Sequence, residues 1–268
     1  MTDTLETVLP FLEEFAPLEL AESWDNVGLL LGDRHQAVRR VMTCLTLTPD
    51  VADEALSRQV DLIVSHHPIL FRPVQKLTTA TSEGRMILNL IRSGVAVYSP
   101  HTAFDSARQG INQQLAEGLG LTEIRPLRPS PLAGFEDVGG GRMGSLPEPV
   151  PFDTFLGRIR TLLRVTHLPM AGSRKSTIST VAVACGSAGE FLSDAVTHGC
   201  DLFLTGETRF HTCLEAREKE ITLVLAGHYA TERSGVEQLA DQLASRFPGI
   251  KVWASQVETD PVVTVSGD

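Results

Sequence analysis

The chain has 268 residues, a formal net charge of −10, a hydrophobic content of 42% and a charged content of 21%. These values are typical of a globular protein with one large domain or two ordinary ones. The acidic charge argues against broad electrostatic binding to nucleic acid, and the sequence shows neither a signal peptide nor an apolar run approaching the ~18 residues of a membrane span. We therefore expect a cytoplasmic location, no membrane contact and no general nucleic-acid partner.

The four cysteines form no CxxC pair, and Cys44 and Cys185 lie within apolar runs. This placement predicts reduced thiols in the core of a cytoplasmic protein.

The first part of the chain alternates predicted helices and strands. Apolar residues at helical spacing predict an opening helix over residues 4–15. The predicted elements that follow are strands 27–31 and 38–46, helix 50–59, strand 61–65, helix 83–93, strand 95–98 and helix 109–118.

Residues 125–151 have a different composition, with prolines at 126, 129, 131, 147, 149 and 151 and a run of three glycines at 139–141. We expect a boundary between domains here, with one hairpin around residues 139–144. A phosphate-loop interpretation of the glycine run is disfavoured, because the run lacks Lys-Ser/Thr and does not join a buried strand to a helix.

The alternation resumes after a helix predicted over 152–164. The further predicted elements are strand 178–184, helix 189–199, strand 201–205, helix 208–219, strand 221–226, helix 231–246 and strand 250–254. Strands alternating with helices of this length predict an α/β fold with largely parallel strands.

Two segments of the chain align with each other. Val41–Phe71 can be laid on Val181–His211 at a constant offset of 140 without a gap, and the predicted strand and helix boundaries coincide. The next strand of each segment ends in a histidine followed four residues later by a carboxylate. We therefore predict an internal duplication: two related α/β/α halves with mixed, largely parallel sheets and a site in the cleft between them. The expected halves are 1–124 and 125–268, with the last helix and strand packing back on the first half and no inserted extra domain.

Polar side chains gather after the predicted strands, where ligands usually bind in α/β proteins. They begin with Ser65-His66-His67-Pro68, for which a polar loop is the alternative interpretation. The full candidate set is His66, His67, His101, Asp105, Glu207, His228 and Glu232. Histidine with carboxylate suits zinc, iron, manganese or nickel better than calcium or magnesium. So many ligands exceed the needs of one ion and predict two divalent ions per chain bridged by a carboxylate, for which we favour Asp105.

Several residues have ordinary structural alternatives. His101 could be a hydrogen-bonded neighbour, Glu207 an acid favoured at a helix N-terminus, and His211 either a lining or a covering side chain. Trp24-Asp25 could be a structural corner or a cleft wall, and we favour the corner. The turn 185–189 could bind an anion, but an ordinary tight turn is the preferred interpretation.

The combined motifs resemble those of a known family. They are Trp24-Asp25-Asn26-Val27-Gly28-Leu29, Ser65-His66-His67-Pro68, His101-Thr102-x-x-Asp105, Thr205-Gly206-Glu207 with His211, and Gly227-His228-Tyr229-x-Thr231-Glu232. This pattern resembles the Nif-three-like dinuclear metal centre family, many of whose bacterial members are named GTP cyclohydrolase I type 2 homologues. The resemblance implies a toroidal homohexamer, a trimer of dimers, with metal sites facing an internal cavity. It also implies His66, His67, Asp105, His228 and Glu232 as metal ligands, with His101 as a close neighbour.

The sequence departs from the family pattern in two places. The region after residue 125 is too short for the extra domain of longer members, and Asn112-Gln113 replaces a frequent Asn-Asp, which puts a role there in doubt.

The leading functional hypothesis is a metal-dependent hydrolase of a nucleotide or related phosphorylated small molecule, with GTP cyclohydrolase activity as the special case that the resemblance implies. The catalytic candidates are His101, Glu207 and His211. One alternative is a non-catalytic, regulatory metal-binding hexamer. A ring that binds single-stranded nucleic acid is disfavoured by the acidic charge.

Overall fold

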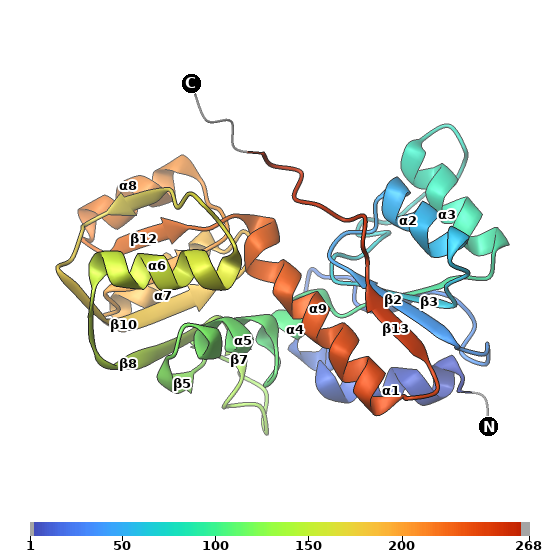
Figure 1. Cartoon of the computed structure of the whole chain (residues 1–268), viewed down its shortest axis with the longest axis horizontal. Helices are drawn as coiled ribbons and strands as arrows, with labels where there is room; N and C mark the ends of the chain where they lie inside the picture. Colours follow the sequence, from blue (N-terminus) through green and yellow to red (C-terminus); the bar gives the residue numbers. More distant parts are fainter. Residues whose placement is uncertain (1–2, 264–268) are drawn as a thin grey trace. The chain divides into compact units, whose positions relative to one another are not determined.

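The computed structural model describes residues 3–263, and their contacts divide them into two compact units (Figure 1). The first unit contains residues up to 13, then 23–101, and the chain from 236 onward. The second unit contains residues 14–22 and 102–235.

The first unit is built on a five-stranded sheet. In sheet order its strands are β1 (Gly28–Leu31), β4 (Ala96–Ser99), β3 (Leu62–Ser65), β2 (Arg40–Cys44) and β13 (Lys251–Ala254). Strands β4, β3, β2 and β13 are parallel, and β1 pairs antiparallel with β4 at the edge. The carboxyl ends of the parallel strands therefore meet at one edge of the sheet, where an α/β protein places its ligands.

Helices cover both faces of this sheet. They are α1 (Leu5–Phe15), α2 (Pro49–Ser57), α3 (Ser82–Arg92) and the second part of α9 (His228–Arg246). The apolar sides of α2 and α3 pack on Met42, Cys44 and Ile63. Because side chains alternate along a strand, Thr43 points to the other face, where its hydroxyl donates to the carbonyl of Val236 in α9 at 2.7 Å.

The second unit has a six-stranded sheet and a two-stranded ribbon. The six strands, in sheet order, are β5 (Thr122–Arg125), β8 (Arg142–Pro151), β10 (Thr177–Ala184), β11 (Leu202–Thr205), β12 (Thr222–Leu225) and β9 (Met170–Gly172). The ribbon pairs β6 (Arg128–Pro129) with β7 (Gly139–Gly140). Strands β10, β11 and β12 are parallel, and the outer strands pair antiparallel.

The helical elements of the second unit are η1 (Leu18–Leu20), α4 (His101–Ser106), α5 (Ile111–Gly118), α6 (Phe152–Leu163), η2 (Gly189–Phe191), α7 (Leu192–Thr197) and α8 (Phe210–Glu218). Leu192, Ala195 and Ala216 of α7 and α8 share a core with Ala182 and Phe203 of the sheet. Helices α5 and α6 contact β8 and β10. Among all described helices, none is both long and apolar enough to cross a membrane.

The predicted fold class, a mixed α/β protein with largely parallel sheets, is confirmed. The strand registers also repeat at the offset of 140: Cys44 lies opposite Ser65, and Ala184 lies opposite Thr205. Asp61 accepts from the amides of residues 39 and 40, and Asp201 accepts from those of residues 179 and 180. These matches support the internal duplication, which stays a prediction.

The expectation that 125–151 is an irregular boundary is wrong for its second half, because Arg142–Pro151 forms the ten-residue strand β8. The first four residues of β8, 142–145, pair with β10 on one side and with β5 on the other. Pro147 and Pro149 fall where the pairing with β10 shifts register, a place where a missing amide hydrogen is tolerated. The prolines thus mark an irregular stretch of a strand rather than a loop.

The unit boundary of the structure lies after His101, whereas the proline-rich composition pointed to residue 124. Helix α5 contacts β8 and β10, which groups residues 102–124 with the second unit. Strand β13 pairs with β2, so the end of the chain belongs to the first unit.

Cys44, Cys185 and Cys200 are buried free thiols, and Cys213 is partly exposed. Burial, followed by the neighbouring Asp201 carboxylate, raises the pKa of Cys200 to about 11. Only about one Cys200 in a thousand is therefore a thiolate at pH 8, and the thiolate is the reactive form.

We expect iodoacetamide to label Cys213 far faster than Cys200 at pH 8, as measured by peptide mass spectrometry. Labelling in guanidinium chloride is the control, and equal rates in the folded protein would contradict the expectation.

Candidate metal centre

The corner that follows β3 carries His66 and His67. Backbone hydrogen bonds continue past the strand, from the His66 amide to the carbonyl of Cys44 (2.9 Å) and from the His67 amide to that of Leu45 (2.8 Å). The hydroxyl of Ser65 donates to the carbonyl of His67 at 2.8 Å. Both histidines are therefore held by well-defined backbone at the carboxyl edge of the sheet.

His101 follows the neighbouring strand β4 and joins the same cluster. One ring nitrogen from each of His66, His67 and His101 lies within 4.8 Å of the others, a spacing that could hold a metal ion. His101 has a φ of +29°, a conformation that side-chain-bearing residues rarely adopt. Such strain persists where the surroundings hold it in place and is common at functional sites.

Two of these imidazole rings are oriented by a hydrogen bond at Nδ1. The Nδ1 of His67 lies 2.7 Å from the hydroxyl oxygen of Thr46. The Nδ1 of His101 lies 2.8 Å from a carboxylate oxygen of Asp25, whose side chain is fully buried. When Nδ1–H donates to such an oxygen, the neutral ring presents Nε2 as a ligand atom.

The second unit presents its own histidine and carboxylates. His228 and Glu232 lie one turn apart at the start of α9, with Nε2 and Oε2 separated by 3.0 Å. Glu207, which follows β11, lies 3.0 Å from the Nδ1 of His228. The hydrogen bond to Glu232 is the main cause that raises the pKa of His228 to about 9 in the metal-free protein. The structure therefore favours an orienting role for Glu207, like those of Thr46 and Asp25.

Gly186 packs closely against this pair. A Cβ at this position would lie 2.2 Å from the Glu232 carboxylate oxygen Oε1 and 3.3 Å from the Nε2 of His228. Its φ of +64° also favours glycine. A nitrogen and a carboxylate facing a space that a methyl group would fill fit a divalent cation of the transition-metal type.

Asp105, in the short helix α4, faces a buried thiol. Cys185 Sγ donates to an Asp105 carboxylate oxygen at 3.2 Å. Burial, then the Asp105 and Glu232 carboxylates, raise the pKa of this thiol well above its usual range. Asn112 donates to the carbonyl of Asp105 (3.1 Å) and accepts from the amide of Cys185 (2.8 Å). Asn112 thus fixes the backbone on both sides of this contact.

Arg142 supports the same helix from β8 and is only 1% exposed. Its Nη2 donates to the carbonyls of Ser106 (3.1 Å) and Ala107 (2.8 Å), directly after Asp105. Its other donors bind the carbonyls of Gly139 and Gly141 and the side-chain oxygen of Gln113. All five N–H donors are used, so Arg142 holds the end of α4 against β8 and α5. Burial lowers its pKa to about 10, and the guanidinium stays charged at neutral pH.

The remaining candidates have other surroundings. His211 is exposed in α8, where its ring contacts that of Phe210. The amide of Gly186 donates to the hydroxyl of Thr231 at 3.1 Å, and that of Cys185 is bound to Asn112, so these two amides do not form an anion site. In the Trp24-Asp25 corner, Asp25 contacts His101, whereas Trp24 is exposed.

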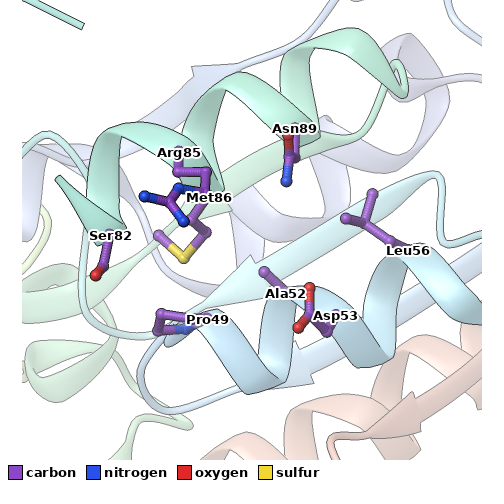
Figure 2. Close-up of a pocket in the computed structure, with 8 residues that line it drawn as sticks. All are labelled: Pro49, Ala52, Asp53, Leu56, Ser82, Arg85, Met86 and Asn89. Carbon is purple, nitrogen blue, oxygen red and sulfur yellow. The ribbon is translucent and has the colours of Figure 1, made fainter. Parts of the chain in front are cut away.

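A separate groove of about 180 Å³ lies between α2 and α3 in the first unit. Figure 2 shows Arg85 and Asn89 of α3 facing Asp53 of α2 across it. The lining residues offer one carboxylate and one guanidinium but no histidine, so the groove is not a candidate metal centre.

Comparison with known proteins identifies the family. The family Duf34/NIF3 (NGG1p interacting factor 3) matches residues 4–261. The chain belongs to this family. A GTP cyclohydrolase 1 type 2 homolog of Clostridium acetobutylicum is 34% identical over 254 residues, which cover 93% of this chain and 94% of the relative. NIF3-like protein 1 of Drosophila melanogaster is 32% identical over 268 residues, covering 98% of this chain and 90% of the relative.

Solved structures of other proteins share this fold. A Bacillus cereus protein related to NIF3 superimposes with a TM-score of 0.89 at 21% identity, over 99% of this chain and all of the other. A Staphylococcus aureus hypothetical protein gives the same TM-score at 26% identity and the same coverage. The resemblance expected from the motifs is therefore confirmed at the level of family and fold.

Proposed function

We propose that this Duf34/NIF3 chain binds two divalent metal ions and hydrolyses a nucleotide or related phosphorylated small molecule. The proposed ligands are His66, His67, Asp105, His228 and Glu232. The observation that carries the proposal is the orientation of the histidines: an oxygen atom lies 2.7 to 3.0 Å from Nδ1 of His67, His101 and His228, which leaves Nε2 of each ring to bind metal.

The two units offer different types of proposed metal ligand. The first unit offers only imidazole nitrogens, from His66 and His67 with His101 beside them. The second offers the imidazole of His228 and the carboxylates of Asp105 and Glu232, both close enough to Cys185 to raise the pKa of its thiol. Nitrogen and carboxylate ligands in this ratio suit zinc, iron, manganese or nickel. The number of ligands and the family membership support two ions rather than one.

Bound divalent ions would supply an activated water and neutralise charge that develops on a substrate oxygen. Asp25, Thr46 and Glu207 would fix the orientation of the imidazole rings, because each has an oxygen within hydrogen-bond distance of a histidine Nδ1. His101 and Glu207 lie beside the proposed ligands and are our candidates to hold a proton during the reaction; His211 is the third candidate, from α8. GTP ring opening is the special case suggested by the names of the relatives.

The proposal is tested by metal content and turnover of the purified protein. We expect two equivalents of metal per chain in the wild type and a loss of at least one in His67→Ala, because the ring nitrogen is removed. Mass spectrometry of the metals and chromatography of reactions with GTP, ATP and nucleoside monophosphates measure both. His35→Ala is the matched control, since His35 is an exposed histidine paired with Glu6 in the same unit.

The outcomes separate the candidate functions. Fewer than two metals per chain in the wild type would contradict the dinuclear centre. Full metal occupancy without turnover of any nucleotide would favour the alternative of a non-catalytic, regulatory metal-binding assembly. We also propose a cytoplasmic homohexamer, supported by the family resemblance and by four free cysteines, and light scattering on the same preparation gives its mass.

A further inference from the structure

An exposed pair of aromatic side chains lies beside the histidine cluster of the first unit. Trp24 is 59% exposed and Phe71 is 44% exposed. Their rings meet edge to face, with centroids 6.0 Å apart. Large aromatic side chains bury much apolar area when they are covered, and adjacent exposed rings are common at ligand-binding surfaces.

The pair is continuous with the proposed metal ligands through His101. The His101 ring lies 6.2 Å from that of Trp24 and 6.4 Å from that of Phe71, centroid to centroid. The same ring lies 5.3 Å from His66 and 5.6 Å from His67. One imidazole therefore contacts both the exposed aromatic rings and the residues proposed to hold metal.

The chain segments that carry the two rings are tied together by hydrogen bonds of neighbouring residues. The side-chain amide of Asn26 donates to the carbonyl of Leu70 at 2.9 Å, which ties the segment after Trp24 to the segment before Phe71. Asp25, next to Trp24, binds His101 at 2.8 Å and accepts from the Asn26 amide at 2.8 Å. Little ordering entropy would be lost when a flat molecule packs on this surface.

We propose that the purine ring of a nucleotide stacks on the exposed indole of Trp24, which Phe71 supports edge to face, and that the phosphate or reacting end of the nucleotide lies toward the histidines. Stacking on aromatic rings is how proteins hold bases without reading their edges, and every purine presents the π-face that it needs. The inference rests on the proposed function and deepens it. The proposed metal ligands account for the phosphate or reacting end of the substrate, and the aromatic side chains would bind its base.

The experiment compares GMP with ribose 5-phosphate, which lacks the base. Isothermal titration of the metal-loaded wild type and Trp24→Ala should show GMP binding weakened about tenfold or more, with ribose 5-phosphate unchanged. Trp24→Phe should recover most of the GMP affinity, because a ring is restored. Trp24 is largely exposed, so the substitutions should leave the thermal unfolding midpoint close to that of the wild type.

Fluorescence gives a second readout because the chain has only two tryptophans. Trp253 is partly buried beneath Arg58 and Lys251 in the same unit and serves as the matched control. We expect GMP to quench the tryptophan fluorescence of Trp253→Phe, in which Trp24 is the remaining tryptophan. The fluorescence of Trp24→Phe should stay unchanged. The titration is repeated after metal removal, so that stacking is measured without turnover.

The outcomes distinguish this inference from the proposed function. Trp24-dependent GMP binding in a protein without turnover would support stacking on Trp24 while the hydrolase proposal fails. Equal losses of GMP and ribose 5-phosphate affinity in Trp24→Ala, or no loss of either, would overturn the stacking proposal even if metal and turnover are found. Trp24 emission that changes with protein concentration rather than with GMP would show that a second copy covers the pair, and would also overturn it.

Discussion

Replacing Arg142 with methionine is expected to lower the free energy of unfolding by on the order of 3 to 5 kcal/mol. Arg142 is buried, and its guanidinium satisfies four backbone carbonyls and the oxygen of Gln113. Methionine fills much of the same volume but leaves those acceptors buried without donors. Urea unfolding of the metal-free protein, followed by circular dichroism, measures the difference.

Arg128→Met is the matched control in the same unit. Arg128 is about half exposed, pairs with Asp194 at 2.6 Å and lies over the ring of Phe191. Because an exposed ion pair contributes little, we expect a loss of about 1 kcal/mol or less. If Arg142→Met does not fold, Arg142→Lys should still unfold at lower urea than Arg128→Met, since an ammonium offers three donors for five acceptors. Equal stabilities of the Arg142 and Arg128 variants would contradict the role assigned to Arg142.

Gly186→Ala is expected to weaken metal binding about 10- to 100-fold. The new Cβ would lie 2.2 Å from the Glu232 carboxylate oxygen, so the carboxylate must move away from its position beside His228. The φ of +64° adds a backbone cost of about 1 to 2 kcal/mol to folding. Titration of the metal-free protein with zinc or manganese measures the affinity, and thermal unfolding measures the stability.

Gly199→Ala separates the two effects. Gly199 has a nearly identical φ of +69°, and a Cβ there would meet nothing within 4 Å. We therefore expect the same backbone cost and unchanged metal affinity. Metal affinity that falls equally in both variants, or in neither, would show that the space beside Glu232 is not part of a metal site.

The sequence alone was sufficient to predict the positions of the key strands and of the residues that follow them. Strand β3 of the first sheet and strand β11 of the second each begin one residue after the start expected from their aliphatic runs and end where expected. His66 and His67 directly follow β3, and Glu207 is the second residue after β11. The spacing of His228 and Glu232 predicted neighbours on one helix face, as observed at 3.0 Å. These features depend on local periodicity and on turn residues, which a sequence displays directly.

The tertiary structure decided which groups support those residues. Asp25 lies 76 positions before His101, and Arg142 lies 36 positions after Ser106, yet both pairs are in hydrogen-bond contact. Strand β8 was missed because prolines hide the alternation of a strand, and only its pairing with β5 and β10 reveals it. Hydrogen bonds between distant segments depend on how sheets and helices pack, and no local pattern records that packing. The sequence by itself therefore determined the family, the fold class and the strand-end candidates, whereas tertiary contacts decided how the histidine rings are turned, how α4 is held and which aromatic side chains remain exposed.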